Sequence, residues 1–474
     1  MTTIKPVSIP ARLLLLFMLA ATLPTWSATA GGAKFPGGHC WLYRVWLTDK
    51  QGGPYSLSRP REFLSEKSLE RRRRQGLPLD STDRPITPNY IIQVEGAGTQ
   101  VVSRSKWNNT LVVRVKKADT AKSLLKLPCV KAVKRLWASP DSLDRRPPRS
   151  TYESDFNLWN EESDNPFGAT YDQVSMLNGD RLHGKGWRGQ GKTIAVLDGG
   201  FMNADVIPAL QQGQVVGHAD FVYPTSDNIF SETEHGTMVL STMAANVPNL
   251  FMGTAPQAQY WLLRTEETRS ETMVEEDFWA AGVEFADSVG ADIVSSSLSY
   301  HDFDDDDQDY IYKQLDGSSF ISHTASMLAA KGIVLVNSAG NDGMGTWKKV
   351  SPPADARDII TVGAVSADRK NAAFSSIGPT ADGRLKPDVM AVGSPTTVIT
   401  GRGVISKNIG TSFSTPLVAG MVACLWQACP GKTAREIIEM VRACADNNDC
   451  PDNIFGFGIP DFWKAYTSAS KSEE

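Results

Sequence analysis

Residues 410–426 read GTSFSTPLVAGMVACLW. From Leu417 onward the apolar side chains recur at helical spacing, with small residues between them, so the stretch predicts a buried helix. We expect Pro416 in its first turn, where the missing N–H costs no hydrogen bond. Ser412 would then lie where unpaired N–H groups and the helix dipole favour a developing oxyanion, as suits a nucleophile. A serine here is also a common helix cap, so the stretch alone leaves both interpretations open.

The chain before this stretch alternates between apolar strands and helices. We expect strands at 193–197, 260–263, 292–294, 333–336 and 359–362, and helices between them, notably at 275–289 and 321–330. Such alternation indicates right-handed crossovers. The predicted fold class is therefore α/β: a doubly wound, mostly parallel sheet with helices on both faces, which binds ligands at the carboxyl ends of its strands.

Three polar residues stand at strand ends or helix starts of this pattern. Asp198 follows the strand at 193–197, His235 opens a helical stretch, and Asn341 lies in a glycine-rich turn after a buried strand. A turn or a cap explains each one alone. Together with Ser412 they supply a carboxylate, an imidazole, an amide donor and a hydroxyl at one edge of the sheet. The order Asp, His, Ser along the chain is one of the orders of a catalytic triad.

The sequence around these residues resembles subtilisin-type serine proteases, the subtilases. The matching motifs are VLDGG at 196–200, HGTMV at 235–239, SAGN at 338–341 and GTSFSTP at 410–416. The resemblance implies acyl transfer: Ser412 attacks a peptide carbonyl, His235 moves the proton, and Asp198 orients the imidazole. The Asn341 amide and the Ser412 N–H would bind the oxyanion. One departure is Gly199, where family members usually carry Ser or Thr.

The same resemblance implies a set of substrate-binding residues. The primary specificity pocket would be lined by Ser297, Leu298, Ser299, Ala339 and Gly340. The acidic segment from residue 264 to residue 276 would form the wall of more remote subsites. Its carboxylates favour two interpretations, a solvated helix start or a preference for basic side chains before the cleaved bond.

The implied chemistry requires no cofactor, and no metal ligand is predicted. Six aspartates lie between residues 302 and 309, but their spacing does not fit an EF-hand, so we expect a solvated acidic loop. Many subtilases bind structural calcium, which the resemblance allows here without assigning ligands. The spacing of Cys and His disfavours a zinc enzyme. The six cysteines permit disulfides in an exported protein, with the pairing left open.

Residues 1–30 are typical of a secretory signal peptide. Lys5 and Arg12 precede the apolar run 13–21, and small residues stand at 28–30. We therefore expect a secreted or periplasmic protein with no membrane anchor after signal cleavage, and a retained anchor is the alternative.

Residues 31–150 differ in charge from the remainder. They carry 24 basic against 10 acidic residues, a net of +14, whereas residues 151–474 carry 22 against 43, a net of −21. Strands at 41–47, 90–94 and 111–115 with helices at 63–70 and 118–127 predict a small α+β domain. Its position resembles that of the subtilase prosegment, which assists folding and blocks the cleft. The opposite net charges of residues 31–150 and residues 151–474 would favour docking of the first segment on the second.

The domain prediction is thus a prosegment at 31–150, a linker and mature start at 151–170, and a catalytic domain at 171–474. Within the prosegment, the run from Arg71 to Arg74 is interpreted as a solvated face, a docking surface or a processing point.

The leading hypothesis is a secreted serine endopeptidase, made as a precursor, that acts on protein or peptide substrates and on its own prosegment. One alternative is a catalytically inactive, subtilase-like peptide-binding protein. Another acyl hydrolase, such as an esterase, is disfavoured because Gly-x-Ser-x-Gly is absent around Ser412. Nucleic-acid binding is disfavoured because the chain after the basic segment is acidic.

Overall fold

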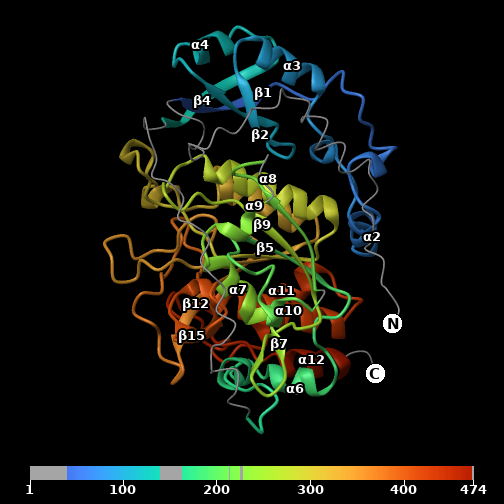
Figure 1. Cartoon of the computed structure of the whole chain (residues 1–474), viewed down its shortest axis with the longest axis vertical. Helices are drawn as coiled ribbons and strands as arrows, with labels where there is room; N and C mark the ends of the chain where they lie inside the picture. The colour runs from blue at the N-terminus through green and yellow to red at the C-terminus, as the bar shows by residue number, and fades with distance from the viewer. Residues whose placement is uncertain (1–39, 139–162, 213, 225–227, 472–474) are drawn as a thin grey trace. The chain divides into compact units, whose positions relative to one another are not determined.

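The computed structural model describes residues 40–138, 163–212, 214–224 and 228–471 (Figure 1). They form two compact units, one mainly from residues 40–138 and one mainly from residue 163 onward. The predicted signal peptide at 1–30, and residues 151–162 of the predicted linker, lie outside the described residues.

The first unit is built on an antiparallel four-stranded sheet in the order β2-β3-β1-β4. Its strands and helices are β1 (Trp41–Leu47), α2 (Glu66–Arg74), α3 (Pro88–Gly96), β2 (Gln100–Ser105), β3 (Thr110–Val115), α4 (Thr120–Leu124) and β4 (Val130–Ala138). Val45, Leu111 and Val113 of the sheet pack with Val94 of α3 and Leu124 of α4 in one core. The prediction of a small α+β domain is confirmed.

Two local predictions for this unit are wrong. Residues 90–94 form part of α3 and not a strand, because Pro88 stands in the first turn, where its fixed φ favours a helix. Arg71 and Arg72 are buried and do not belong to a solvated face. Arg72 is paired at 2.8 Å with the buried carboxylate of Asp83, and such a buried charge requires a partner of this kind.

The second unit contains a seven-stranded parallel sheet in the order β13-β12-β11-β10-β5-β9-β6. The strands are β5 (Thr193–Asp198), β6 (Val215–Asp220), β9 (Gln259–Arg264), β10 (Ile293–Ser296), β11 (Val334–Ser338), β12 (Ile360–Ser366) and β13 (Val389–Ser394). The five predicted strands are all present. The two additional strands, β6 and β13, are the edges of the sheet, and β6 alternates exposed and half-buried residues instead of forming an apolar run.

Helices cover both faces of this sheet, as predicted. α8 (Glu275–Val289) and α9 (Phe320–Ala330) lie on one side of the strands, and α7 (His235–Ala244) and α10 (Thr411–Ala428) lie on the other (Figure 1). The remaining elements are α5 (Tyr171–Ser175), α6 (Gly179–Gly184), β7 (Asn246–Val247), β8 (Phe251–Met252), β14 (Thr396–Ile399), β15 (Ile405–Asn408), α11 (Ala434–Ala443) and α12 (Phe462–Lys471). The prediction of a doubly wound α/β fold is confirmed.

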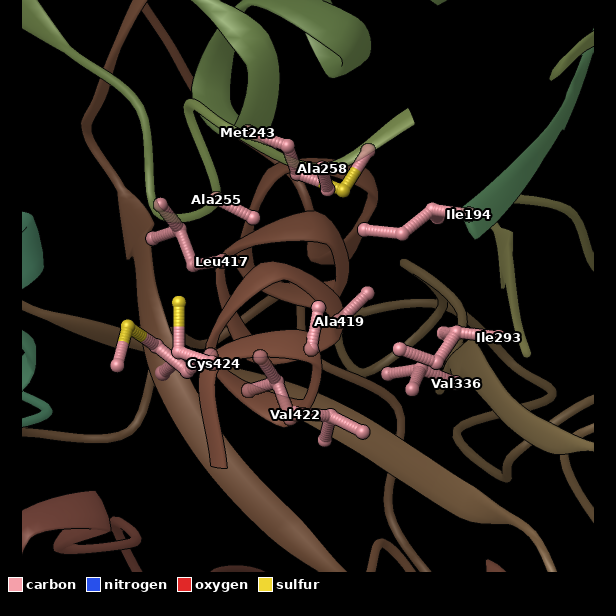
Figure 2. Packing of buried hydrophobic residues seen from close by; sticks show 14 of the residues in the cluster. Ile194, Met243, Ala255, Ala258, Ile293, Val336, Leu417, Ala419, Val422 and Cys424 are labelled. Carbon is pink, nitrogen blue, oxygen red and sulfur yellow. The ribbon is translucent and has the colours of Figure 1, made fainter. Parts of the chain in front are cut away.

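α10 is the centre of the core. Its Leu417, Ala419 and Val422 pack among apolar side chains that the sheet supplies, such as Ile293 and Val336 (Figure 2). All residues of α10 from Thr411 to Trp426 are buried. Burial of apolar side chains on this scale fixes the helix, and therefore its first turn, relative to the strand ends.

All six cysteines are free thiols, and only Cys450 is exposed. Among the described residues, no helix is long and apolar enough to cross a membrane. The same residues include no group of three or more His, Cys, Asp or Glu side chains arranged to hold a metal ion.

A buried histidine makes the stability of the second unit depend on pH. His183 is 2% exposed, donates from Nε2 to the Thr254 carbonyl at 2.9 Å and stacks on Phe167. Burial, offset only in part by that hydrogen bond, lowers the pKa of His183 from 6.5 to about 4. The folded protein thus holds this imidazole neutral.

We predict that stability falls as the pH drops from 6.5 toward 4, because the unfolded chain protonates His183 first. The loss attributable to this residue is about 3 kcal/mol by pH 4. Urea unfolding near neutrality and near pH 4 should show a smaller acid-induced loss for His183→Gln than for the wild type. His218→Gln, at an exposed histidine, serves as the control. Equal losses in all three proteins would exclude His183 as the source.

Candidate active site

A carboxylate and an imidazole form the first half of the site. β5 ends at Asp198, which is 1% exposed, and α7 begins at His235. The His235 Nδ1 lies 2.8 Å from Oδ2 and 3.0 Å from Oδ1 of Asp198. The close approach of α7 requires Gly236, because a Cβ there would stand 2.3 Å from the Gly200 carbonyl oxygen. The structure thus brings together the two residues that the sequence predicted as a pair.

The charge of Asp198 controls the proton affinity of His235. Burial favours the neutral ring, but attraction and hydrogen bonding from Asp198 outweigh it and raise the pKa of His235 above 6.5. With Nδ1–H donated to Asp198, the neutral ring carries its lone pair on Nε2, which is the tautomer that a general base needs.

Gly199 is accommodated by the packing around Asp198. Its N–H donates to Asp198 Oδ1 at 2.8 Å, and its carbonyl accepts from the buried Arg264 Nε at 2.9 Å. A Cβ at position 199 would lie 2.8 Å from the Thr268 methyl group. A backbone N–H therefore supports the Asp198 carboxylate although residue 199 has no hydroxyl side chain.

Ser412 is the second residue of α10. Gly410 precedes the helix with φ 146°, a conformation that L side chains rarely adopt. At this position in a helix the Ser412 N–H has no helical acceptor. The Ser412 hydroxyl donates to the Ser297 carbonyl at 3.4 Å rather than to His235. The centroid of the Phe413 ring, on the next residue, is 5.6 Å from the centroid of the His235 imidazole, so α10 begins next to His235.

The predicted position of Pro416 is wrong, and the difference matters for the site. The helix begins at Thr411, so Pro416 lies in its second turn. Its missing N–H would have bonded to the carbonyl of Ser412, four residues earlier. That carbonyl accepts instead from the Ser297 hydroxyl at 2.8 Å. Ser297 and Ser412 therefore exchange two hydrogen bonds, which join the end of β10 to the start of α10.

Asn341 is oriented by Thr411, a residue that was predicted only as part of a motif and not as part of the site. Its Oδ1 accepts from the Thr411 N–H at 2.9 Å and from the Thr411 Oγ1 at 3.0 Å. Both contacts engage the carbonyl oxygen of the side chain, so the Nδ2 amino group is directed elsewhere. Asn341 is exposed while Thr411 is fully buried. A buried threonine thus fixes the orientation of an amide donor at the surface.

We predict that Thr411→Val weakens this donor without removing it. The variant loses the Oγ1 contact and keeps the N–H contact, so any rate limited by Asn341 should fall about fivefold, equivalent to about 1 kcal/mol. Steady-state kinetics on a peptide should place the loss in kcat with KM unchanged. Thr411→Ser keeps the hydroxyl and should restore the rate. An unchanged kcat in Thr411→Val would contradict the orienting role.

The predicted specificity residues form two neighbouring strand ends. Ser297, Leu298 and Ser299 follow β10, and Ala339 and Gly340 follow β11. The Asn337 amide of β11 donates to the Leu298 carbonyl at 3.0 Å, which holds the two segments together. Ser297 lies beside Ser412 through the two hydrogen bonds described above, and the role of these five residues in substrate specificity stays a prediction.

The acidic segment after β9 is mostly buried, so its interpretation as a solvated helix start is wrong. Glu267 is paired with Arg264 and, at 2.6 Å, with Arg269. Glu275 accepts two backbone N–H groups. Glu271 alone of these glutamates is exposed, so a basic preference of the cleft would depend on it.

The aspartates between residues 302 and 309 are mostly exposed, as predicted for a solvated loop. Two of them bond to backbone groups: Asp304 accepts from the Glu271 N–H, and Asp309 accepts from the Phe303 N–H.

The parallel sheet, with Asp198, His235, Asn341 and Ser412 at one edge of it, defines a subtilisin-like α/β protein. The chain belongs to the subtilase family, whose model matches residues 189–458. Residues 42–153 match the model of a peptidase S8 propeptide domain of Bacteroidota. Each unit of the structure therefore has its own family match.

Several curated proteins are similar to this chain. Subtilisin NAT of Bacillus subtilis subsp. natto is 28% identical over 276 residues, 57% of this chain and 65% of the relative. Subtilisin DY of Bacillus licheniformis is 26% identical over 277 residues, 58% and 90% of the two chains. Serine protease AprX of Bacillus subtilis (strain 168) is 28% identical over 323 residues, which cover 61% of this chain and 68% of the relative. The match thus spans less than two thirds of the first of these relatives.

Proposed function

We propose that the protein is a secreted serine endopeptidase made as a precursor with a cleavable prosegment. One observation carries the proposal: Asp198 holds His235 by Nδ1, at hydrogen-bond distance, beside the residue that follows Ser412. The relatives that are named as subtilisins and as a serine protease support the same activity.

In the proposed mechanism a rotation of the Ser412 side chain turns its hydroxyl from the Ser297 carbonyl toward His235 Nε2. The oxygen attacks the substrate carbonyl while the imidazole takes the proton, and Asp198 stabilises the imidazolium. The oxyanion accepts from the Ser412 N–H and the Asn341 amide. His235 then protonates the leaving amine, and water hydrolyses the acyl-enzyme by the same steps in reverse.

The prosegment proposal rests on the first unit. Its match to a propeptide-domain model, its α+β fold and its net charge of +14 over residues 31–150 support a role in folding and inhibition of the acidic catalytic unit. Secretion is supported by residues 1–30, whose basic residues, apolar run and small residues are typical of a signal peptide.

A fluorophosphonate probe tests the proposal on the purified protein after the prosegment has been removed. It should label Ser412, and a casein substrate should be cleaved in a reaction that the same probe blocks. Labelling identifies an activated serine, and cleavage separates an endopeptidase from a catalytically inactive peptide-binding protein. Absence of both would contradict the proposed function.

A further inference from the structure

A buried glutamate lies beside the turn that carries the predicted triad carboxylate. β5 and β9 pair Asp198 with Arg264, and the Thr265 N–H donates to the Asp198 carbonyl at 3.0 Å. Glu266 is the next residue and is 8% exposed. A Cβ on Gly199 would lie 3.5 Å from the Glu266 Cβ. The glutamate thus occupies the space next to the turn that Asp198 and Gly199 form.

The same glutamate is bonded to the segment that holds Ser412. The hydroxyl of Tyr300, which is 1% exposed, donates to Glu266 Oε1. Tyr300 ends the segment that begins with Ser297, whose two hydrogen bonds to Ser412 fix the start of α10. A continuous chain of contacts therefore runs from the strand beside Asp198, through Glu266 and Tyr300, to Ser412.

The partners of Glu266 are compatible with a neutral carboxylic acid. Its Oε1 is bonded to the hydroxyls of Tyr300 and Thr265, and a hydroxyl can donate or accept. The nearby Glu275 differs in its partners, because both of its oxygens accept backbone N–H groups, at 2.8 and 2.7 Å, although burial and the charge of Glu266 raise the pKa of Glu275 as well. Burial, followed by the charges of Glu271 and Asp198, raises the pKa of Glu266, and these effects outweigh the hydrogen bonds from Tyr300 and Thr265, which lower it.

We propose that Glu266 is a positioning residue for the proposed peptidase reaction. It acts as a neutral acid, and its bond to Tyr300 holds Asp198 and Ser412 in the relative position that the reaction needs. A charged Glu266 would place a second negative charge beside Asp198. A neutral one provides the link without that charge. The inference rests on the proposed function.

The test compares three variants of the full chain with the wild type. Glu266→Ala removes the link, Tyr300→Phe removes its hydroxyl donor, and Glu266→Gln keeps a neutral group of the same shape. Tyr312→Phe is the matched control, because that hydroxyl donates at 3.1 Å to the carbonyls of Pro379 and Thr380. The measurements are kcat and KM on a peptide substrate, the pH dependence of kcat/KM, and the rate of fluorophosphonate labelling.

Displacement of Ser412 relative to Asp198 should lower kcat and the labelling rate about tenfold in Glu266→Ala and Tyr300→Phe, with KM changed less than about twofold. Glu266→Gln should restore both rates and leave the acidic limb of the pH profile in place. If Glu266→Ala does not fold, Tyr300→Phe tests the same link.

If the wild type is active, either of two results would overturn the proposal. Wild-type kcat in Tyr300→Phe or Glu266→Ala would mean that the link does not position the site. A shift of the acidic limb to lower pH in Glu266→Gln would mean that Glu266 is charged, because removing a negative charge lowers the proton affinity of His235. If the wild type neither cleaves the peptide nor reacts with the fluorophosphonate, the proposed function itself would be contradicted.

Discussion

Ser412→Ala is expected to abolish peptide hydrolysis, with kcat lower by about 10⁶-fold. The variant keeps the oxyanion donors and the Asp198–His235 pair but has no oxygen to form the acyl-enzyme. Because Ser412 is buried at the start of α10 and its side chain differs from alanine by one oxygen, the fold should be retained. Hydrolysis of a chromogenic peptide and fluorophosphonate labelling measure the loss.

The same variant tests self-processing. If the precursor cleaves itself, Ser412→Ala made in a protease-free host should keep residues 31 to 150, whereas the active protein should lose them. Ser414→Ala is the matched control, because that hydroxyl lies one residue beyond Phe413 in the same helix and donates to the Thr411 carbonyl at 3.0 Å. Identical processing of the Ser412 and Ser414 variants would contradict self-cleavage.

The parts of the site that the sequence predicts are those carried by local patterns. Asp198 follows an apolar strand, and Ser412 precedes an apolar helix, so each position is determined by the element next to it. The alternation of strands and helices then places both at one edge of the sheet. The pairing of Asp198 with His235 follows from that topology together with the motif around each residue.

The parts that could not be predicted depend on contacts between distant residues. Thr411 was identified only as part of a motif, because its bond to Asn341 joins positions 70 residues apart. The link between Glu266 and Tyr300 spans 34 residues. The misplaced strand at 90–94 has a different cause: its apolar residues suit a strand or a helix, and Pro88 decides between them.

Asn341→Ala is expected to lower kcat by about 10²–10³-fold with little change in KM. The amide would stabilise charge that exists only in the transition state, so substrate binding in the ground state does not depend on it. Steady-state kinetics on one peptide give both parameters, and circular dichroism checks the fold. A kcat equal to that of the wild type would show that Asn341 does not contribute to the oxyanion hole.

Combining this change with Thr411→Val distinguishes a direct role from an orienting one. If Thr411 acts only by holding the Asn341 carboxamide, it has nothing to orient once residue 341 is alanine. The double variant should then be no slower than Asn341→Ala, although Thr411→Val alone is slower than the wild type. If the two losses add in full, Thr411 must instead contribute through its own contacts, such as the bond from its Oγ1 to the Gly340 carbonyl at 3.3 Å.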